Sequence, residues 1–194
     1  MKPSKVVDVA NLYEDGTLAG AGNGQSFLGK LIDCIKGESA GSVIALDFAK
    51  VELVSASFFR AAFRPFRDYA RSSAKLYLFF ANANDATLEE VRFFAESTGD
   101  AYPFGKLNSA KVIRSSFVVG KLDEKQAKTL AALIKLKEAD AGQLLDAVPD
   151  TAVSSSAAWS NRLAALASKG LIMERLEGRL KKYRPITEDL AYGA

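Results

Sequence analysis

The chain has 194 residues, of which 48% are hydrophobic, and its 26 basic and 23 acidic side chains give a net charge of +3. It contains no histidine and a single cysteine, Cys34, which argues against imidazole catalysis, internal disulfides and His/Cys metal sites. No signal peptide is recognisable, and no apolar run approaches the roughly 20 residues that a bilayer requires. We therefore expect a soluble, cytoplasmic protein with no cofactor, no metal and no membrane contact.

Short β-rich runs alternate with helical runs in the first 120 residues, a pattern typical of an α/β sheet covered by helices. The predicted strands span residues 5–10, 42–48 and 75–81, and the predicted helices span residues 26–36, 57–71 and 87–97. Residues 112–119 are predicted to form a further strand or an extended connection. A glycine-rich stretch, residues 16–24, is interpreted as a flexible connection, with anion binding at the following helix start as the alternative.

The rest of the chain predicts a second unit of three helices and a β-hairpin. The helices are predicted over residues 123–136, 140–148 (stopped by Pro149) and 154–168 (ended by Gly170), and the hairpin turns at Glu177 and Gly178. All 12 phenylalanines lie at or before Phe117. One uniform core would rarely sort its phenylalanines in this way, so we predict two domains, residues 1–120 and 121–194.

Positive charge is concentrated in the second unit. Residues 151–187 carry seven basic and two acidic side chains, whereas residues 1–120 are nearly balanced. In the third predicted helix, Trp159, Leu163 and Leu166 recur at helical spacing and should face the other helices. Short polar side chains are then left on the outer side, where they can reach base edges or a phosphate.

The order of helix, Lys169-Gly170-Leu171-Ile172 junction, tight turn and basic strand resembles the second half of a winged helix-turn-helix DNA-binding domain. This resemblance implies duplex DNA as the partner, with Asn161 as the residue to test for base reading. The implied DNA-binding residues are Ser155, Ser156, Ser160, Asn161, Lys169, Arg175, Arg179, Lys181, Lys182 and Arg184.

Other interpretations of the same residues stay open. A Ser-rich helix start is commonly only an N-cap, and a Lys/Arg-rich hairpin is commonly only an edge protected against aggregation. Winged helices also serve as protein-docking modules. The turn over residues 149–153 is longer than the tight form, and the first turn of the third helix carries no Arg or Lys. Direct base readout should therefore be weak.

Residues 46–59, Leu-Asp-Phe-Ala-Lys-Val-Glu-Leu-Val-Ser-Ala-Ser-Phe-Phe, resemble the central strand, loop and helix of STAS and STAS-like domains, the fold of anti-sigma factor antagonists. Asp47, Val51 and Ser57 fit the family motif. Ser55 replaces its Asp, and Ala56 stands where the family has its phosphoryl-accepting Ser. The resemblance thus implies a STAS-like fold without the phosphoryl switch, and we interpret Ser55 and Ser57 as N-caps.

Arginines recur along the predicted helix over residues 57–71, at Arg60, Arg64, Arg67 and Arg71. A solvated helix face is the simplest interpretation. The alternatives are a second contact to nucleic acid or a partner-binding surface for an acidic protein, made by Arg60, Arg64 and Arg67. Pro65 is expected to kink or interrupt this helix.

The sequence therefore predicts an α/β, STAS-like domain followed by a winged helix-turn-helix domain, acting as a DNA-binding regulator. We expect a homodimer, because one small module seldom secures enough interface for high specificity. The alternative is a protein-interaction adaptor of the partner-switching type that does not bind DNA. An enzyme is not expected, because Asp47, Asp85 and Asp100 are scattered and no nucleophile has an evident base.

Overall fold

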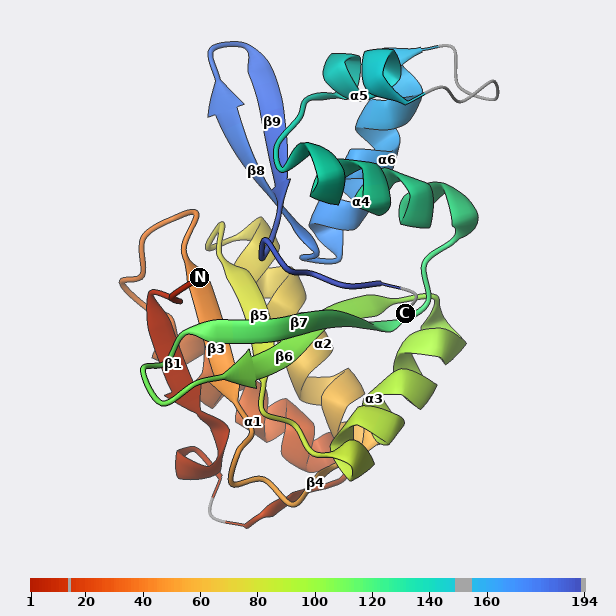
Figure 1. Cartoon of the computed structure of the whole chain (residues 1–194). Coiled ribbons are helices and arrows are strands. Elements are labelled where there is room, and N and C mark those ends of the chain that lie inside the picture. The colour runs from red at the N-terminus through yellow and green to blue at the C-terminus, as the bar shows by residue number, and fades with distance from the viewer. Residues whose placement is uncertain (14, 149–154, 193–194) are drawn as a thin grey trace.

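The computed structural model describes residues 1–13, 15–148 and 155–192 and has a mixed α/β fold (Figure 1). Its main sheet has the strand order β1, β3, β5, β6, β7; the first four are parallel, and β7 is antiparallel to β6. The bounds are β1 Lys5–Asp8, β3 Val43–Asp47, β5 Tyr77–Ala81, β6 Ala101–Leu107 and β7 Ile113–Gly120. Two short strands, β2 Thr17–Leu18 and β4 Leu53–Val54, pair separately. The predicted α/β class is confirmed.

Alternate residues of the central strands enter two different apolar clusters, as expected for a sheet covered on both faces. Ile44 and Phe80 belong to a cluster with three helices, α1 Ala21–Cys34, α2 Ala56–Ser72 and α3 Asp85–Thr98. Tyr77 and Phe79 belong to a second cluster, whose other members come mainly from the C-terminal part of the chain.

That C-terminal part contains α4 Glu124–Leu136, α5 Ala141–Ala147, α6 Ser156–Ser168 and a hairpin of β8 Ile172–Glu177 and β9 Leu180–Pro185. Figure 1 shows these elements gathered at one end of the molecule, with the last residues returning beside β7. Ala191 hydrogen-bonds through its backbone to Ser116 and Val118 of β7 and so covers an otherwise open edge of the sheet. The predicted division into domains 1–120 and 121–194 stays a prediction, since the two parts share the second cluster.

Strand β6 was not predicted from the sequence. Pro103 and Gly105 are poor strand formers, yet both lie in β6, and the pairing with β7 shifts register between Phe104 and Lys106. A Cβ on Gly105 would lie 2.8 Å from the Phe79 ring and 3.0 Å from the Ser116 Cα. The glycine therefore serves the close packing of the sheet rather than a turn.

Helix α1 begins at Ala21, so the end of the glycine-rich stretch is helical and is not a flexible connection. The reason lies in the packing of α1 on α2. A Cβ on Gly24 would lie 2.9 Å from both the Ala61 Cβ and the Phe58 carbonyl oxygen. Glycine allows the two helices this close approach.

The predicted interruption at Pro65 is wrong, because α2 runs through it from Ala56 to Ser72. The helix begins at Ala56, so Ser57 lies in its first turn and is not an N-cap, contrary to the prediction. The Ser55 hydroxyl accepts a hydrogen bond from the Phe58 amide at 3.3 Å, so Ser55 is the N-cap. The buried apolar face of α2, which includes Phe59, Phe63 and Phe66, holds the helix against the sheet.

Candidate nucleic-acid interface

Helix α6 has one buried face and one exposed face. Trp159, Leu163 and Leu166 are fully buried in the second cluster, as their spacing predicts. The opposite side is in contact with solvent and carries Ser155, Ser156, Ser160 and Asn161. The predicted turn over residues 149–153 lies outside the described residues. The short polar side chains at the start of α6 thus remain accessible to a ligand.

Ser155 is the N-cap residue of α6, but its side chain makes no capping hydrogen bond. In this respect it differs from Ser55, Asn84 and Asp123, each of which caps its helix through a side-chain oxygen. Among the described residues, the Ser155 hydroxyl is therefore not committed to the helix start. Backbone N–H groups at such a start favour an anion.

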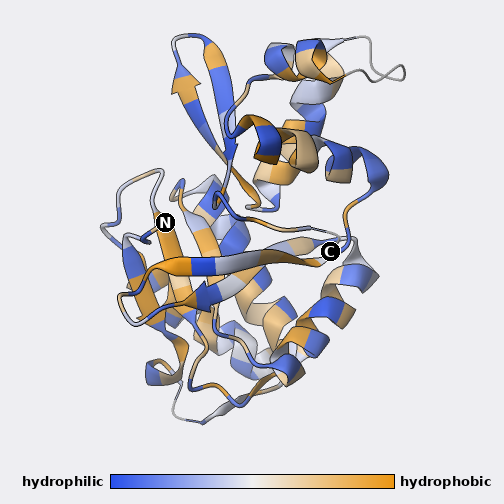
Figure 2. Cartoon of the chain, viewed as in Figure 1, coloured by the Kyte–Doolittle hydropathy of each residue, from blue (hydrophilic) through white to orange (hydrophobic). Residues whose placement is uncertain are grey.

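Strands β8 and β9 form a hairpin that projects from the helices (Figure 1). Glu177 pairs with Leu180, so Gly178 and Arg179 form a two-residue turn, with Gly178 in the left-handed region at φ 61°. Figure 2 shows apolar and polar residues mixed along the hairpin, and Leu176 and Leu180 are 72% and 58% exposed. Arg179, in the turn, is exposed and lies at the tip of the hairpin.

The hairpin cations fall into two groups. Arg175 makes two hydrogen bonds to Glu138, at 2.7 and 3.0 Å, and Lys182 donates to Asp140 at 2.8 Å. Lys181 is 57% exposed, with Glu174 at 3.7 Å. Arg179 and Arg184 are exposed and make no ion pair with any residue in the described ranges. Arg179, Lys181 and Arg184 are therefore more available to an outside anion than Arg175 and Lys182, which are hydrogen-bonded to acids.

The paired acids are held ionised by these contacts. The hydrogen bond from Arg175 lowers the pKa of Glu138, and the hydrogen bond from Lys182, followed by one from the Gln143 amide, lowers the pKa of Asp140. An ionised acid beside each cation cancels much of its field. Arg175 and Lys182 are thereby weaker candidates for DNA contact than the sequence alone indicated.

Lys169, another predicted DNA contact, faces inward. Its ammonium group donates to the Gly99 carbonyl at 2.6 Å and lies 3.7 Å from Asp100, and its side chain is only 14% exposed. It therefore fastens the end of α6 to the turn between α3 and β6. This placement corrects the prediction that Lys169 is available to a phosphate.

Arg67 is also buried, and the predicted basic stripe on α2 is corrected accordingly. Its guanidinium donates to Asp100 at 2.8 Å and to Asp68 at 2.9 and 3.1 Å, and it lies 4.7 Å from the Tyr102 ring centre. Arg60 is exposed, and Arg64 is 43% exposed with Asp100 4.0 Å away. Of the three proposed partner-binding arginines, Arg60 and Arg64 are accessible and Arg67 is not.

The contacts of Asp100 with Arg67 and Tyr102 make folding sensitive to acid. Burial alone would raise the pKa of this carboxyl, but the hydrogen bond and charge of Arg67, with a hydrogen bond from Tyr102, hold it below its usual value. Such a group contributes stability that is present above its unfolded pKa of about 3.9 and is lost as pH falls through the folded pKa. We predict that the urea midpoint falls below about pH 4, and falls less steeply in Asp100→Asn. Equal steepness in both proteins would contradict this role.

Two residues of the segment that resembles the STAS motif, Asp47 and Ala56, are hydrogen-bonded to residues from other parts of the chain. Asp47 is buried and accepts hydrogen bonds from Asn82 at 2.8 Å and Lys111 at 3.0 Å. The Ala56 amide, at the start of α2, donates to the Glu90 carboxylate at 2.8 Å. A carboxylate of the chain itself thus occupies the anion position at this helix start.

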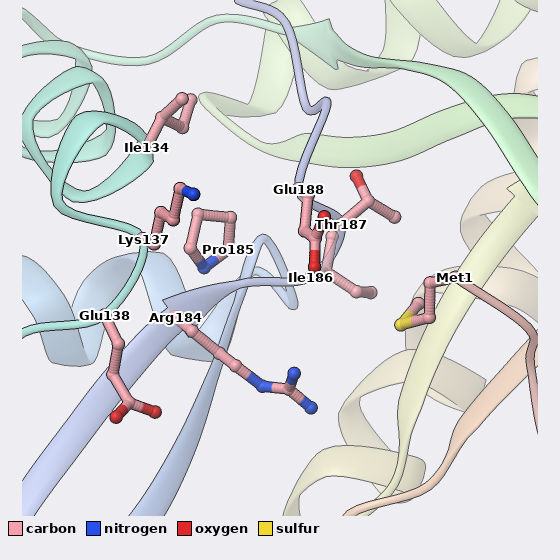
Figure 3. Close-up of a pocket in the computed structure, with 9 residues that line it drawn as sticks. All are labelled: Met1, Ile134, Lys137, Glu138, Arg184, Pro185, Ile186, Thr187 and Glu188. Atoms are coloured by element: carbon pink, nitrogen blue, oxygen red, sulfur yellow. The ribbon is translucent and has the colours of Figure 1, made fainter.

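A cleft of about 340 Å³ lies at the base of the hairpin, between the ends of α4 and β9 and Met1 (Figure 3). Lys137 and Arg184 line it together with Glu138 and Glu188. Figure 3 shows the Arg184 side chain extending away from Lys137. The mixed charges favour no single class of ligand.

The described ranges contain neither a metal-binding cluster nor a membrane-spanning helix. No group of three or more Cys, Asp or Glu side chains there is placed to hold a metal ion. No helix there has both the length and the apolar character needed to cross a lipid bilayer.

No family model matches the chain, and a search of curated proteins also gave no match. The only support for the candidate nucleic-acid interface is therefore the geometry of α6 and the hairpin. The sequence did not predict that Glu138 and Asp140 would pair with the hairpin cations Arg175 and Lys182. A signal was present, because Asp140 and Gln143 have the spacing of a capping box, which fixes Asp140 at the start of α5.

Proposed function

We propose that this protein is a DNA-binding regulator in which α6 and the hairpin contact duplex DNA. The observation that carries the proposal is the exposed polar face of α6 together with a projecting hairpin on which Arg179, Lys181 and Arg184 are exposed. Polar side chains at a helix start suit base edges, and cations on an exposed hairpin suit phosphates.

The order of elements supports a winged-helix assignment for this part. Helices α4, α5 and α6 precede the hairpin, and Ala139, between α4 and α5, exchanges two backbone hydrogen bonds with Tyr183, at 3.0 and 2.9 Å. Ala139 thereby extends the hairpin by a third, one-residue strand. The hairpin is thus braced at its base, while its tip at Gly178 and Arg179 remains exposed.

In this proposal Asn161 reads bases and the hairpin supplies affinity. An asparagine side chain can pair bidentately with adenine, and Asn161 lies on the exposed face, one turn into α6. The α/β part, with its STAS-like order of elements, serves as a sensor, dimerisation or partner-docking module. Dimerisation would double the interface that one module offers.

The test is fluorescence anisotropy of a random 20-base-pair duplex across a salt series. Each phosphate contact contributes about 0.9 to the log–log salt slope, so replacing Arg179, Lys181 and Arg184 by alanine should reduce the slope by about 2 to 3. Arg92→Ala, an exposed arginine on α3, is the matched control and should change neither affinity nor slope. An unchanged slope in the triple variant would contradict the assigned role of the hairpin.

A second candidate function is the protein-interaction adaptor, and the pairing of Arg175 with Glu138 and of Lys182 with Asp140 favours it. These pairs remove part of the charge that DNA would require. An adaptor should show no measurable duplex affinity at near-physiological salt. The same anisotropy series therefore separates the two candidates.

A further inference from the structure

A groove of about 410 Å³ lies between the hairpin and the α/β part of the molecule. One side is formed by Ala40 and Gly41, in the α1–β3 loop, and by Lys75, in the α2–β5 turn. The other side is formed by the hairpin, chiefly Leu176 and Lys181. Figure 1 shows both loops below the hairpin, at the end of the sheet where β3 and β5 begin.

The base of this groove is held firmly in place. The Tyr77 hydroxyl donates to the Glu174 carbonyl at 3.3 Å and accepts from the Glu174 amide at 2.7 Å, which fixes β8 to β5. The Arg71 guanidinium lies 3.9 Å from the centre of the Tyr77 ring and donates to the Ala167 carbonyl of α6 at 3.0 Å. The groove is therefore tied to both proposed DNA-contacting elements, α6 and the hairpin.

Positive charge predominates along the groove. Lys75 is exposed and makes no ion pair in the described part of the chain. Glu174 is shared between Arg71 at 3.9 Å and Lys181 at 3.7 Å, so one carboxylate faces two cations. An adjoining groove of about 260 Å³ adds Arg184 and, with it, Glu138, so the excess of positive charge comes from Lys75 and the hairpin side of the first groove. A polyanion is the ligand class that this excess charge favours.

We infer that the duplex held by α6 and the hairpin continues along this groove, where Lys75 and Lys181 contact the phosphates of its flanking base pairs. The inference rests on the proposed function. Lys181 belongs to the hairpin and also lines the groove, so one backbone can pass from the hairpin to the α/β part without a break in positive charge. The α/β part would then extend the footprint on DNA.

The test compares a 12-base-pair duplex with a 30-base-pair duplex, using the full chain and a salt series. Lys75→Asn removes the charge, and asparagine tolerates the left-handed backbone of this position, at φ 56°. We expect the salt slope on the long duplex to fall by about 1, with a larger fall for Lys75→Glu. Arg92→Glu, with the same charge change as Lys75→Glu, should leave both slopes unchanged.

The outcomes separate the inference from the proposed function. If the 12-base-pair duplex binds but Lys75→Asn leaves the long-duplex slope unchanged, the inference is overturned and the proposed function stands. If the Lys75 variants weaken both duplexes equally, the contact is not to flanking DNA and the inference is also overturned. Absence of binding to either duplex overturns both. Far-UV circular dichroism melts matching the wild type establish that the variants are folded.

Discussion

Replacing Arg67 by alanine should lower the free energy of unfolding by about 3–5 kcal/mol, because it leaves the carboxylate of Asp100 buried without its main partner. The side chains of Arg67 and Asp100 are only 7% and 9% exposed, and their atoms are 2.8 Å apart. Tyr102 and the Ala101 amide would still donate to Asp100. Lys169 and Arg64 would remain 3.7 and 4.0 Å from it, but neither makes the close buried contact that Arg67 makes. Urea unfolding at pH 7 measures the loss.

Arg60→Ala is the control for this variant, since Arg60 lies on the same helix but is exposed. Its unfolding free energy should stay within about 0.5 kcal/mol of the wild type. Arg67→Met combined with Asp100→Asn removes both charges and should cost less than Arg67→Ala alone. A wild-type urea midpoint for Arg67→Ala would rule out this ion pair as a stabilising contact.

Replacing Trp159 by alanine should cost about 3–5 kcal/mol, the range for truncating a large buried aromatic side chain. Trp159 is fully buried in the cluster that also contains Tyr77 and Phe79 of the sheet. Because this cluster joins the C-terminal helices to the sheet, we expect one shifted unfolding transition for the whole chain. Trp159 is the only tryptophan, so the variant has no tryptophan fluorescence to follow. Far-UV circular dichroism during urea unfolding therefore measures the transition.

Two further variants serve as references for Trp159→Ala. Trp159→Phe keeps an aromatic ring in the cluster and should cost clearly less than Trp159→Ala. Ser160→Ala changes the next residue, which is exposed, and should be nearly neutral. Two separate transitions, with only one of them shifted by Trp159→Ala, would show that the shared cluster does not couple the two parts.

The elements with regular apolar spacing were the predictable part of this fold. A short β-rich run predicted the strand at residues 42–48, and helical spacing predicted the buried face of Trp159, Leu163 and Leu166. Strand β6 was missed because Pro103 and Gly105 disfavour a strand, whereas pairing with β7 and packing on Phe79 override that preference.

The sequence predicted where the residues of the candidate site lie, but not which of its basic side chains are paired with acids. Spacing alone placed Asn161 on an outer face and the basic residues on a hairpin. It did not reveal that Arg175 would meet Glu138, 37 residues earlier, or that Arg67 would meet Asp100, 33 residues later. Such pairings depend on how distant segments pack together. Arginines at helical spacing therefore predict that they share one face of the helix. They do not predict whether that face is exposed to solvent or paired with acids from elsewhere in the chain.

The proposed function requires that the start of α6 and the hairpin contact duplex DNA together. Amide hydrogen exchange of the full chain, with and without a bound duplex, tests it most directly. We expect slower exchange on DNA binding in two segments, residues 155–161 and 175–182, with little change in α3. Unaltered exchange in both segments while the duplex is bound would contradict the claim.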